Sequence, residues 1–259
     1  MTIRFFAAIL YCWSVGVAYA ACDKPIYLTF DTGNMSVAEH VATTLRKHQV
    51  QATFFLANEK TYRGDYAMDD FWLPFWRTLA TEGHSFGSHT FDHTYFVKNI
   101  SNGHVQVKSQ FGAQAGRLRS LNQPELCQDI RRVDERFMVM TGKHLDPIWR
   151  APGGKTSIEL IRMSNQCGWT HVGWSAHGFL GDELPSDRFP NLVLLERALK
   201  ELRPGDVAMA HLGIWSRKDP WAQAVLEPLI VGLKRQGYCF GLIRDIRQSS
   251  AVSGIMSLP

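Results

Sequence analysis

Residues 25–34 read Pro-Ile-Tyr-Leu-Thr-Phe-Asp-Thr-Gly-Asn. The first seven of these residues are rich in β-branched, aromatic and aliphatic side chains, which favours a buried strand over residues 25–31. The strand ends in Asp31, and the Thr-Gly-Asn that follows is typical of a turn. In an α/β barrel, functional side chains stand at the carboxyl ends of the strands. Asp31 is therefore the first candidate site residue.

Beyond this strand, short apolar runs alternate with segments of helical period. Such alternation predicts parallel strands with helices outside them and a site at the carboxyl ends of the strands. We expect an α/β fold, a distorted (β/α) barrel of about seven parallel strands. The strands are expected at residues 25–31, 50–56, 85–88, 147–150, 170–174, 206–211 and 238–243, and the helices at residues 37–48, 71–80, 124–140, 157–167, 191–202 and 221–236.

Residues 94–123 interrupt this alternation. They show no clear period and are rich in Gly, Asn, Gln and Ser. We expect a long surface excursion without regular structure, and segments of this length are usually functional or mobile.

The first twenty residues have the parts of a secretory signal peptide. Arg4 gives a positive start, residues 5–17 are apolar but short for a bilayer span, and Ala18-Tyr19-Ala20 fits a cleavage site. We therefore expect a signal peptide at residues 1–20 and one domain at residues 21–259, secreted or periplasmic and without a membrane span. Lipidation of Cys22 is a second-ranked alternative, because Tyr19 stands where such signals usually have Leu.

Composition narrows the class of partner and the compartment. The chain has 28 basic and 24 acidic residues and no basic run, so a nucleic-acid partner is not expected. Four cysteines would remain after export, an even number that favours disulfides, and they allow three pairings. We favour Cys22 with Cys239, near the first and last strands, and Cys127 with Cys167, on two helices flanking one strand.

A second candidate site follows the expected strand at residues 85–88. His89 and His93 are four residues apart, so on a helix or a helix-like turn both imidazoles would leave the same face. Two neutral imidazoles that converge form half of a zinc site. The alternative is that one histidine caps a turn and the other is a core residue.

Four motifs in order resemble the polysaccharide deacetylase family, also called the chitooligosaccharide deacetylase homology domain or carbohydrate esterase family 4. The family's Thr-Phe-Asp-Asp-Gly resembles residues 29–33, its His-Ser/Thr-x-x-His residues 89–93, its Arg-x-Pro residues 150–152, and its Leu-x-His residues 209–211. One such motif is weak support, but four in order are strong. The resemblance implies an exported, metal-assisted hydrolase that removes N-acetyl groups from amino sugars of peptidoglycan, a chitin-like polymer or an exopolysaccharide.

The resemblance also implies roles for individual residues. Asp31 would be the catalytic base, His211 the general acid, and Arg150 the cation that orients Asp31 and keeps it ionised. His89 and His93 would hold a divalent metal, with zinc the favoured ion, which lowers the pKa of bound water and polarises a carbonyl.

Position 32 departs from the family pattern. Thr32 stands where the family has its third metal ligand, and a hydroxyl is a poor zinc ligand beside a carboxylate. Three outcomes are open: Asp31 itself binds the metal; Asn34, Asp92 or a water completes the shell; or the metal binds weakly or not at all. The family's fourth motif, Asp residues after a Trp, also departs after Trp174, where His177 and Asp182 are the candidate substitutes.

Substrate contacts are expected on the loops at the site end of the strands. Phe91, Trp215 and Trp221 are placed where a sugar ring could stack, and Pro152 belongs to the Arg-x-Pro motif. Two rival functions remain: an O-acetyl esterase on the same scaffold, and a catalytically degenerate carbohydrate-binding protein. Five retained polar residues argue against the binding protein, because buried polar groups are costly without a role or a partner.

Overall fold

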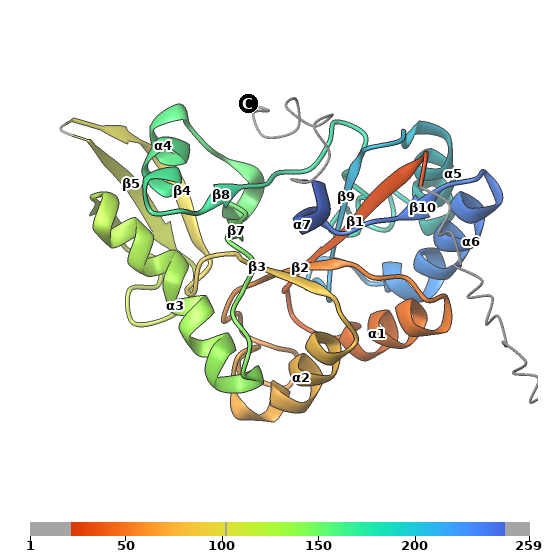
Figure 1. Ribbon diagram of the computed structural model, residues 1–259, viewed down its shortest axis with the longest axis horizontal. Coiled ribbons are helices and arrows are strands. Elements are labelled where there is room, and N and C mark those ends of the chain that lie inside the picture. The colour runs from red at the N-terminus through yellow and green to blue at the C-terminus, as the bar shows by residue number, and fades with distance from the viewer. Residues whose placement is uncertain (1–21, 102, 247–259) are drawn as a thin grey trace, which may run out of the picture.

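The computed structural model describes residues 22–101 and 103–246, so the expected signal peptide at residues 1–20 lies outside the described residues. A sheet of seven parallel strands forms the centre (Figure 1), as the sequence predicts. Its order is β10-β1-β2-β3-β7-β8, and β9 also pairs with β1. The strands are β1 (Pro25–Asp31), β2 (Thr53–Leu56), β3 (Ser85–Ser88), β7 (Ile148–Trp149), β8 (Thr170–His171), β9 (Val207–His211) and β10 (Cys239–Phe240).

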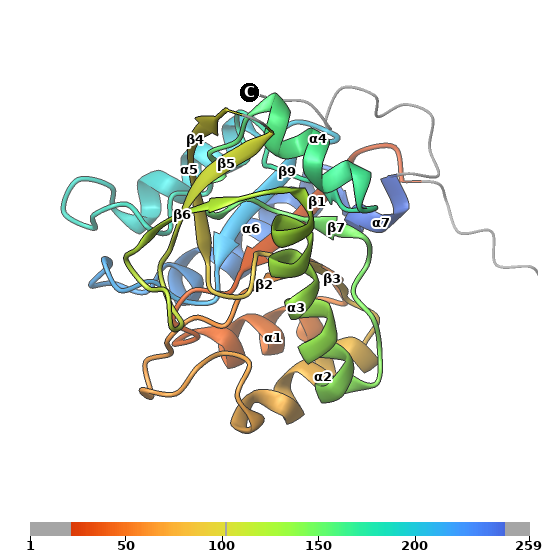
Figure 2. The ribbon, with the colours of Figure 1, turned by 90° about the vertical axis from the view of Figure 1, so that its left-hand side faces the viewer.

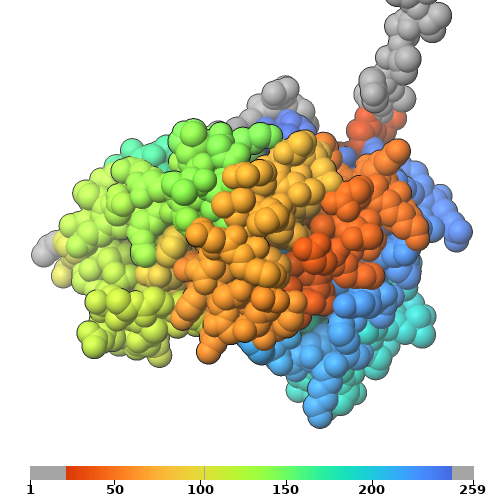
Figure 3. Space-filling view, turned by 90° about the horizontal axis from the view of Figure 1, so that it is seen from below, coloured from red at the N-terminus to blue at the C-terminus, as the bar shows by residue number. Residues whose placement is uncertain are grey.

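Helices pack around this sheet, and Figure 3 shows the face on which α1 and α2 lie between α3 and the C-terminal helices. Each helix turns its apolar stripe inward, as α1 does with Val41 and Leu45. The helices are α1 (Ala38–Lys47), α2 (Leu73–Thr81), α3 (Gln123–Thr141), α4 (Ile158–Gln166), α5 (Asn191–Glu201), α6 (Glu227–Arg235) and α7 (Ile243–Ile246), with short 3₁₀ turns at Asp70–Trp72 and Pro152–Gly154.

The side chains on the two faces of β1 pack into different hydrophobic clusters, because side chains alternate along a strand. Ile26, Leu28 and Phe30 join the large core under the helices. Tyr27 joins a second, smaller cluster that includes side chains of β2, β7 and β9. The same alternation directs Asp31 to the inner side, where polar side chains gather at the strand ends.

The sheet is a distorted barrel because the two strands that would close it, β8 and β9, are not joined by a full ladder of hydrogen bonds. Within the described residues, no strand pairing links β8 to β9. The segment around Phe179 lies there instead: Phe179 forms an isolated parallel bridge with Met209, and the Leu180 N–H donates to the Met209 carbonyl at 3.1 Å. This segment leads to Asp182.

The expectation of an irregular excursion at residues 94–123 is wrong. These residues form a three-stranded antiparallel sheet of β4 (Thr94–Ile100), β5 (His104–Ser109) and β6 (Leu118–Leu121), which faces the viewer in Figure 2. Phe96, Val105, Val107 and Leu121 are its buried members. The alternation of apolar and polar residues in this segment is short and interrupted by Gln, Ser and Gly, so it did not indicate strands. Packing against the rest of the domain stabilises the sheet instead.

Two expected elements near the C-terminus also differ. The helix expected at residues 221–236 is interrupted by a π-helical turn, Ala222–Leu226, before α6 begins. Pro228 in the first turn of α6 has no N–H to donate to the carbonyl of residue 224, which disrupts regular α-helical bonding there. The last strand is only Cys239–Phe240, and α7 follows it.

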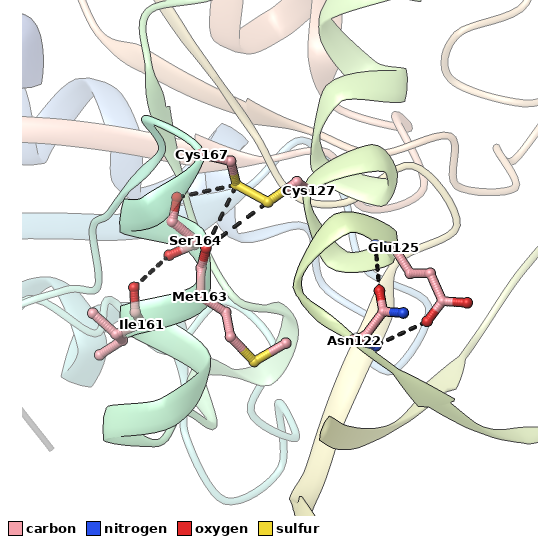
Figure 4. The surroundings of a disulfide bond; sticks show 7 residues. All are labelled: Asn122, Glu125, Cys127, Ile161, Met163, Ser164 and Cys167. Atoms are coloured by element: carbon pink, nitrogen blue, oxygen red, sulfur yellow. Dashed lines mark hydrogen bonds between the residues drawn. A yellow bond between two sulfur atoms is a disulfide. The ribbon is translucent and has the colours of Figure 1, made fainter. Parts of the chain in front are cut away.

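Both favoured disulfides are present. Cys127 of α3 is bonded to Cys167 at the end of α4 (Figure 4), and Cys22 is bonded to Cys239. Figure 4 also shows the capping box at the start of α3, where the Asn122 and Glu125 side chains each accept a backbone N–H from the other residue. A sulfur in a disulfide cannot also carry a lipid thioether, which argues against the lipid anchor at Cys22. Over residues 22–101 and 103–246, no helix combines the length and apolarity needed to cross a membrane.

Candidate active site

Parallel pairing places the candidate residues at one edge of the sheet. Asp31 of β1 lies opposite His211 of β9 in the ladder, and the Leu212 N–H donates to the Asp31 carbonyl at 2.9 Å. Similarly, the Arg150 N–H donates to the Ser88 carbonyl at 2.8 Å, directly before His89. The carboxyl ends of neighbouring strands thus bring together four residues that lie up to 180 positions apart in the sequence: Asp31, His89, Arg150 and His211.

Asp31 and Arg150 form a buried ion pair. Arg150 Nη1 donates to Asp31 Oδ1 at 2.7 Å and to Thr29 Oγ1 at 2.9 Å, and the Arg150 side chain is fully buried. Its other donors reach the carbonyls of Val172 and Gly173. Burial alone would raise the pKa of Asp31, but Arg150, with help from neighbouring histidines, lowers it below its usual value. Asp31 is therefore a carboxylate at neutral pH.

His89 and His93 are brought together by a turn and not by a helix. Thr90 and His93 have φ angles of 59° and 48°, a region that non-glycine residues rarely occupy. The two imidazole rings are 4.9 Å apart between centroids. His89 Nδ1 donates to the Arg150 carbonyl at 2.9 Å, which leaves the lone pair on Nε2, 3.5 Å from Asp31 Oδ2. Burial lowers the pKa of His89 to about 3, so its imidazole is neutral.

His211 is paired with Asp182 on the loop beside β9. Asp182 accepts the His211 backbone N–H at 2.6 Å and lies 3.1 Å from Nδ1. Burial alone would lower the pKa of His211, but the charge of Asp182 raises it to about 10, so the imidazole is protonated at neutral pH. Of the two candidate substitutes for the fourth motif, Asp182 reaches the site. His177 lies instead 3.9 Å from Glu201, with half of its side chain exposed.

Thr32 and the two residues suggested as replacement ligands, Asn34 and Asp92, have other partners. Thr32 Oγ1 donates to the Phe55 carbonyl and accepts the Ala57 N–H at 2.8 Å, so this hydroxyl fastens β1 to the end of β2. Asn34 Oδ1 accepts the Ser36 N–H, as in an Asx turn. Asp92 pairs with Arg132 of α3 at 2.8 Å. None of the three is directed at His89 and His93 by these bonds.

The expected substrate-binding residues differ in how accessible they are. Trp215 is 65% exposed, whereas Trp221 and Pro152 are buried. Phe91 lies under the Arg132 guanidinium, 4.3 Å from its ring centroid. Trp221 lines a small cavity of about 60 Å³ beside His211. Their substrate contacts stay predictions, and exposure favours Trp215 as the stacking ring.

Two residues at the site were not foreseen. Thr29 Oγ1 accepts a hydrogen bond from the Arg150 side chain. The sequence pattern could have indicated this residue, because Thr29 shares the inner face of β1 with Asp31. Tyr95 lies with its ring 4.9 Å from that of His93, and its hydroxyl donates to Gln110. Tyr95 was missed because it belongs to the segment expected to be irregular.

The donor chemistry around His89 and His93 fits a divalent metal. His93 Nδ1 is buried and has no hydrogen-bond partner among the described residues, a costly state for a polar atom unless a ligand uses the ring. The bond from His89 Nδ1 to a backbone carbonyl is the outer-shell contact typical of metal-binding histidines. In the described part of the chain, however, no three His, Cys, Asp or Glu side chains already have metal-binding geometry.

Comparison with known proteins decides the family. The family model described as polysaccharide deacetylase matches residues 18–172, more than half of the chain. The chain belongs to the polysaccharide deacetylase family. A peptidoglycan-N-acetylmuramic acid deacetylase of Bacillus subtilis is 26% identical over 225 residues, covering 86% of this chain and 72% of that protein. A chitooligosaccharide deacetylase of Azorhizobium caulinodans is 26% identical over 226 residues, covering 83% and 91%.

Solved structures confirm the fold of this deacetylase family member. A family 4 acetyl xylan esterase from Clostridium thermocellum gives a TM-score of 0.65 at 20% identity, covering 87% of this chain and 91% of that one. A family 4 pseudoenzyme from Bacillus anthracis gives a TM-score of 0.62 at 20% identity, covering 86% and 64%. The expected family, barrel class and deacetylase type of enzyme are thus confirmed, whereas the roles of single residues stay predictions.

Proposed function

We propose that this protein is an exported hydrolase that removes N-acetyl groups from the amino sugars of an envelope polysaccharide, using a divalent metal. One observation supports this most: an ionised Asp31 and a protonated His211 stand opposite each other on adjacent strands, each held in that state by a buried partner. The named relatives act on peptidoglycan or chitooligosaccharide. Two disulfides fit an oxidising compartment outside the cytoplasm.

The two groups suit the two proton transfers of amide hydrolysis. Asp31 takes a proton from the attacking water, and Arg150 holds its carboxylate in place and ionised. His211 gives a proton to the leaving amine nitrogen, and Asp182 holds its imidazole in the charged form. The opposite protonation states of a carboxylate and an imidazole on adjacent strands allow both steps at the same pH.

A metal would be held by His89 and His93, with a carboxylate as the third ligand. When bound, it would polarise the acetyl carbonyl and make a neighbouring water more acidic. Asp31 is the third ligand that the sequence offers, and its Oδ2 lies 3.5 Å from His89 Nε2.

The proposal predicts that metal content and activity are lost together in His89→Ala. The purified wild-type protein, dialysed against a mild chelator and reloaded, is expected to retain about one zinc per chain, and the variant to retain none, since a ligand is removed. Metal analysis and release of acetate from N-acetylated polymer are the measurements, with His144→Ala as a surface control. A wild-type protein that releases acetate without binding any divalent metal would contradict the metal-assisted mechanism.

The rivals are separated by substrate. An O-acetyl esterase would release acetate from O-acetylated xylan but not from matched N-acetylated oligomers. A carbohydrate-binding protein would bind the polymer and release acetate from neither substrate. Loss of activity has a precedent in this fold, since the Bacillus anthracis protein is described as a pseudoenzyme.

Trp215 is expected to contribute to polymer binding. Because its ring is largely exposed on the loop that follows His211, Trp215→Ala should raise KM for a polymer several-fold and leave kcat nearly unchanged. Kinetics with polymer and with a short oligomer measure this. Equal KM values for variant and wild type on the polymer would exclude a stacking role.

A further inference from the structure

We infer that Glu59 supplies the carboxylate that Thr32 lacks, as the third protein ligand of the metal held by His89 and His93. This inference rests on the proposed function only in requiring that a metal binds there. It replaces Asp31 in that role and leaves Asp31 free as the base. A site of two histidines and one glutamate is a common catalytic zinc set.

The first support is the place of Glu59 beside position 32. Glu59 Oε1 accepts the Gly33 N–H at 2.9 Å, so its carboxylate lies at the turn that immediately follows Thr32. The same turn is held to the loop after β2 by a second bond, from the Tyr62 N–H to the Asn34 carbonyl at 2.9 Å. The loop after β2 is therefore bonded to the chain next to position 32, where the family has its metal-binding acid.

The second support is that this loop is also fastened to the turn that bears the histidines. The His89 N–H donates to the Leu56 carbonyl at 2.7 Å, and the Asn58 N–H donates to the Phe91 carbonyl at 2.8 Å. Glu59 is the next residue along. Its backbone therefore sits between the turn after β1 and the turn after β3, which are the two turns from which the family draws its metal ligands.

The third support is the environment of the Glu59 side chain. Glu59 is only 8% exposed, and its Oε2 accepts no hydrogen bond from the described residues. One oxygen of this carboxylate is thus left to bind a cation, and the buried Nδ1 of His93, which has no partner among the described residues, shows that the imidazole also has an unused polar atom.

The other oxygen donors at these turns are already used. Thr32 and Asn34 are bonded to backbone groups, Asp92 is paired with Arg132, and Asp31 is shared between Arg150 and its role as base. The donor atoms do not yet converge as they stand. The inference therefore requires the Glu59 carboxylate to turn toward the imidazoles when a metal binds.

Cobalt titration of the full protein tests the inference, because the visible absorption of Co²⁺ reports its ligands independently of activity. Wild type, Glu59→Gln and Glu183→Gln are compared after removal of metal. Glu183 is the matched control, because it is an exposed glutamate next to Asp182. We expect Glu59→Gln to lower Co²⁺ affinity by more than the roughly 10- to 100-fold that loss of an outer-shell contact costs, and Glu183→Gln to leave it unchanged.

The outcomes are distinguishable. Affinity and spectrum of Glu59→Gln equal to wild type would overturn the role of Glu59 and leave the proposed function standing. Binding lost in Asp31→Asn but kept in Glu59→Gln would assign the third ligand to Asp31 instead. No Co²⁺ binding by wild type would overturn both this inference and the metal part of the proposed function.

Folding is checked by thermal unfolding in chelator, where Glu59→Gln and Glu183→Gln should keep the wild-type Tm. If Glu59→Gln does not fold, Glu59→Asp takes its place, because it keeps the carboxylate but shortens its reach. Glu59→Asp should then shift the Co²⁺ absorption and weaken binding, and an unchanged spectrum and affinity would overturn the role.

Discussion

Asp182→Asn is expected to lower kcat at pH 7 by about 10²- to 10⁴-fold, the range that a general acid contributes. In the wild-type protein the Asp182 carboxylate raises the pKa of His211 to about 10, so the imidazole holds its proton at pH 7. Without that charge, burial lowers the pKa of His211 and only the smaller effects of Asp31 and Glu183 oppose it. The general acid would then lose its proton at a lower pH than in the wild-type protein.

The pH dependence of activity tests the direction of this change in the pKa of His211. Wild-type activity should persist up to about pH 10 and fall as His211 loses its proton. In Asp182→Asn the alkaline limb should move to lower pH, so that activity recovers as the pH is lowered, while Arg150 keeps Asp31 ionised. Asp187→Asn, on the same loop but exposed, should keep the wild-type profile. An alkaline limb still near pH 10 in Asp182→Asn would disprove the role of Asp182.

Arg150→Met is expected to lower the free energy of unfolding by about 3–5 kcal/mol at pH 7, the cost of leaving one member of a buried ion pair without its partner. The Arg150 side chain is fully buried and that of Asp31 is 3% exposed, so water cannot replace the lost contact. Unfolding in urea measures the loss. The exposed pair of Arg162 and Glu159 provides the control, and Arg162→Met should change stability little.

The dependence on pH separates charge from packing. Because the pKa of Asp31 is lowered in the folded protein, its contribution to stability is present above the unfolded pKa of about 3.9 and is lost as the pH falls through the folded value. In Arg150→Met, burial would raise that pKa, so the deficit relative to wild type should shrink as the pH falls. Asp31→Asn combined with Arg150→Met should recover much of the loss. A deficit that is constant with pH would show that packing, not charge, is responsible.

The sequence determined what depends on local pattern. Alternating apolar runs of strand and helix period predicted the parallel sheet, because each period specifies which face is buried. The end of β1 predicted Asp31 as a site residue, and spacing paired His89 with His93. Even cysteine number and the positions of the cysteines near particular elements favoured the two disulfides that are present.

Tertiary structure decided what depends on contacts between distant segments. Residues 94–121 form a sheet because their weak alternation gains a partner surface, which no local preference reports. The choice of Asp182 over His177 depended on a loop lying beside β9. The bonds of Thr32 to the end of β2, and the approach of Glu59 to Gly33, are hydrogen bonds between segments 23 to 26 residues apart. Local sequence fixes the conformation of each turn, but only the packed sheet fixes which turns meet.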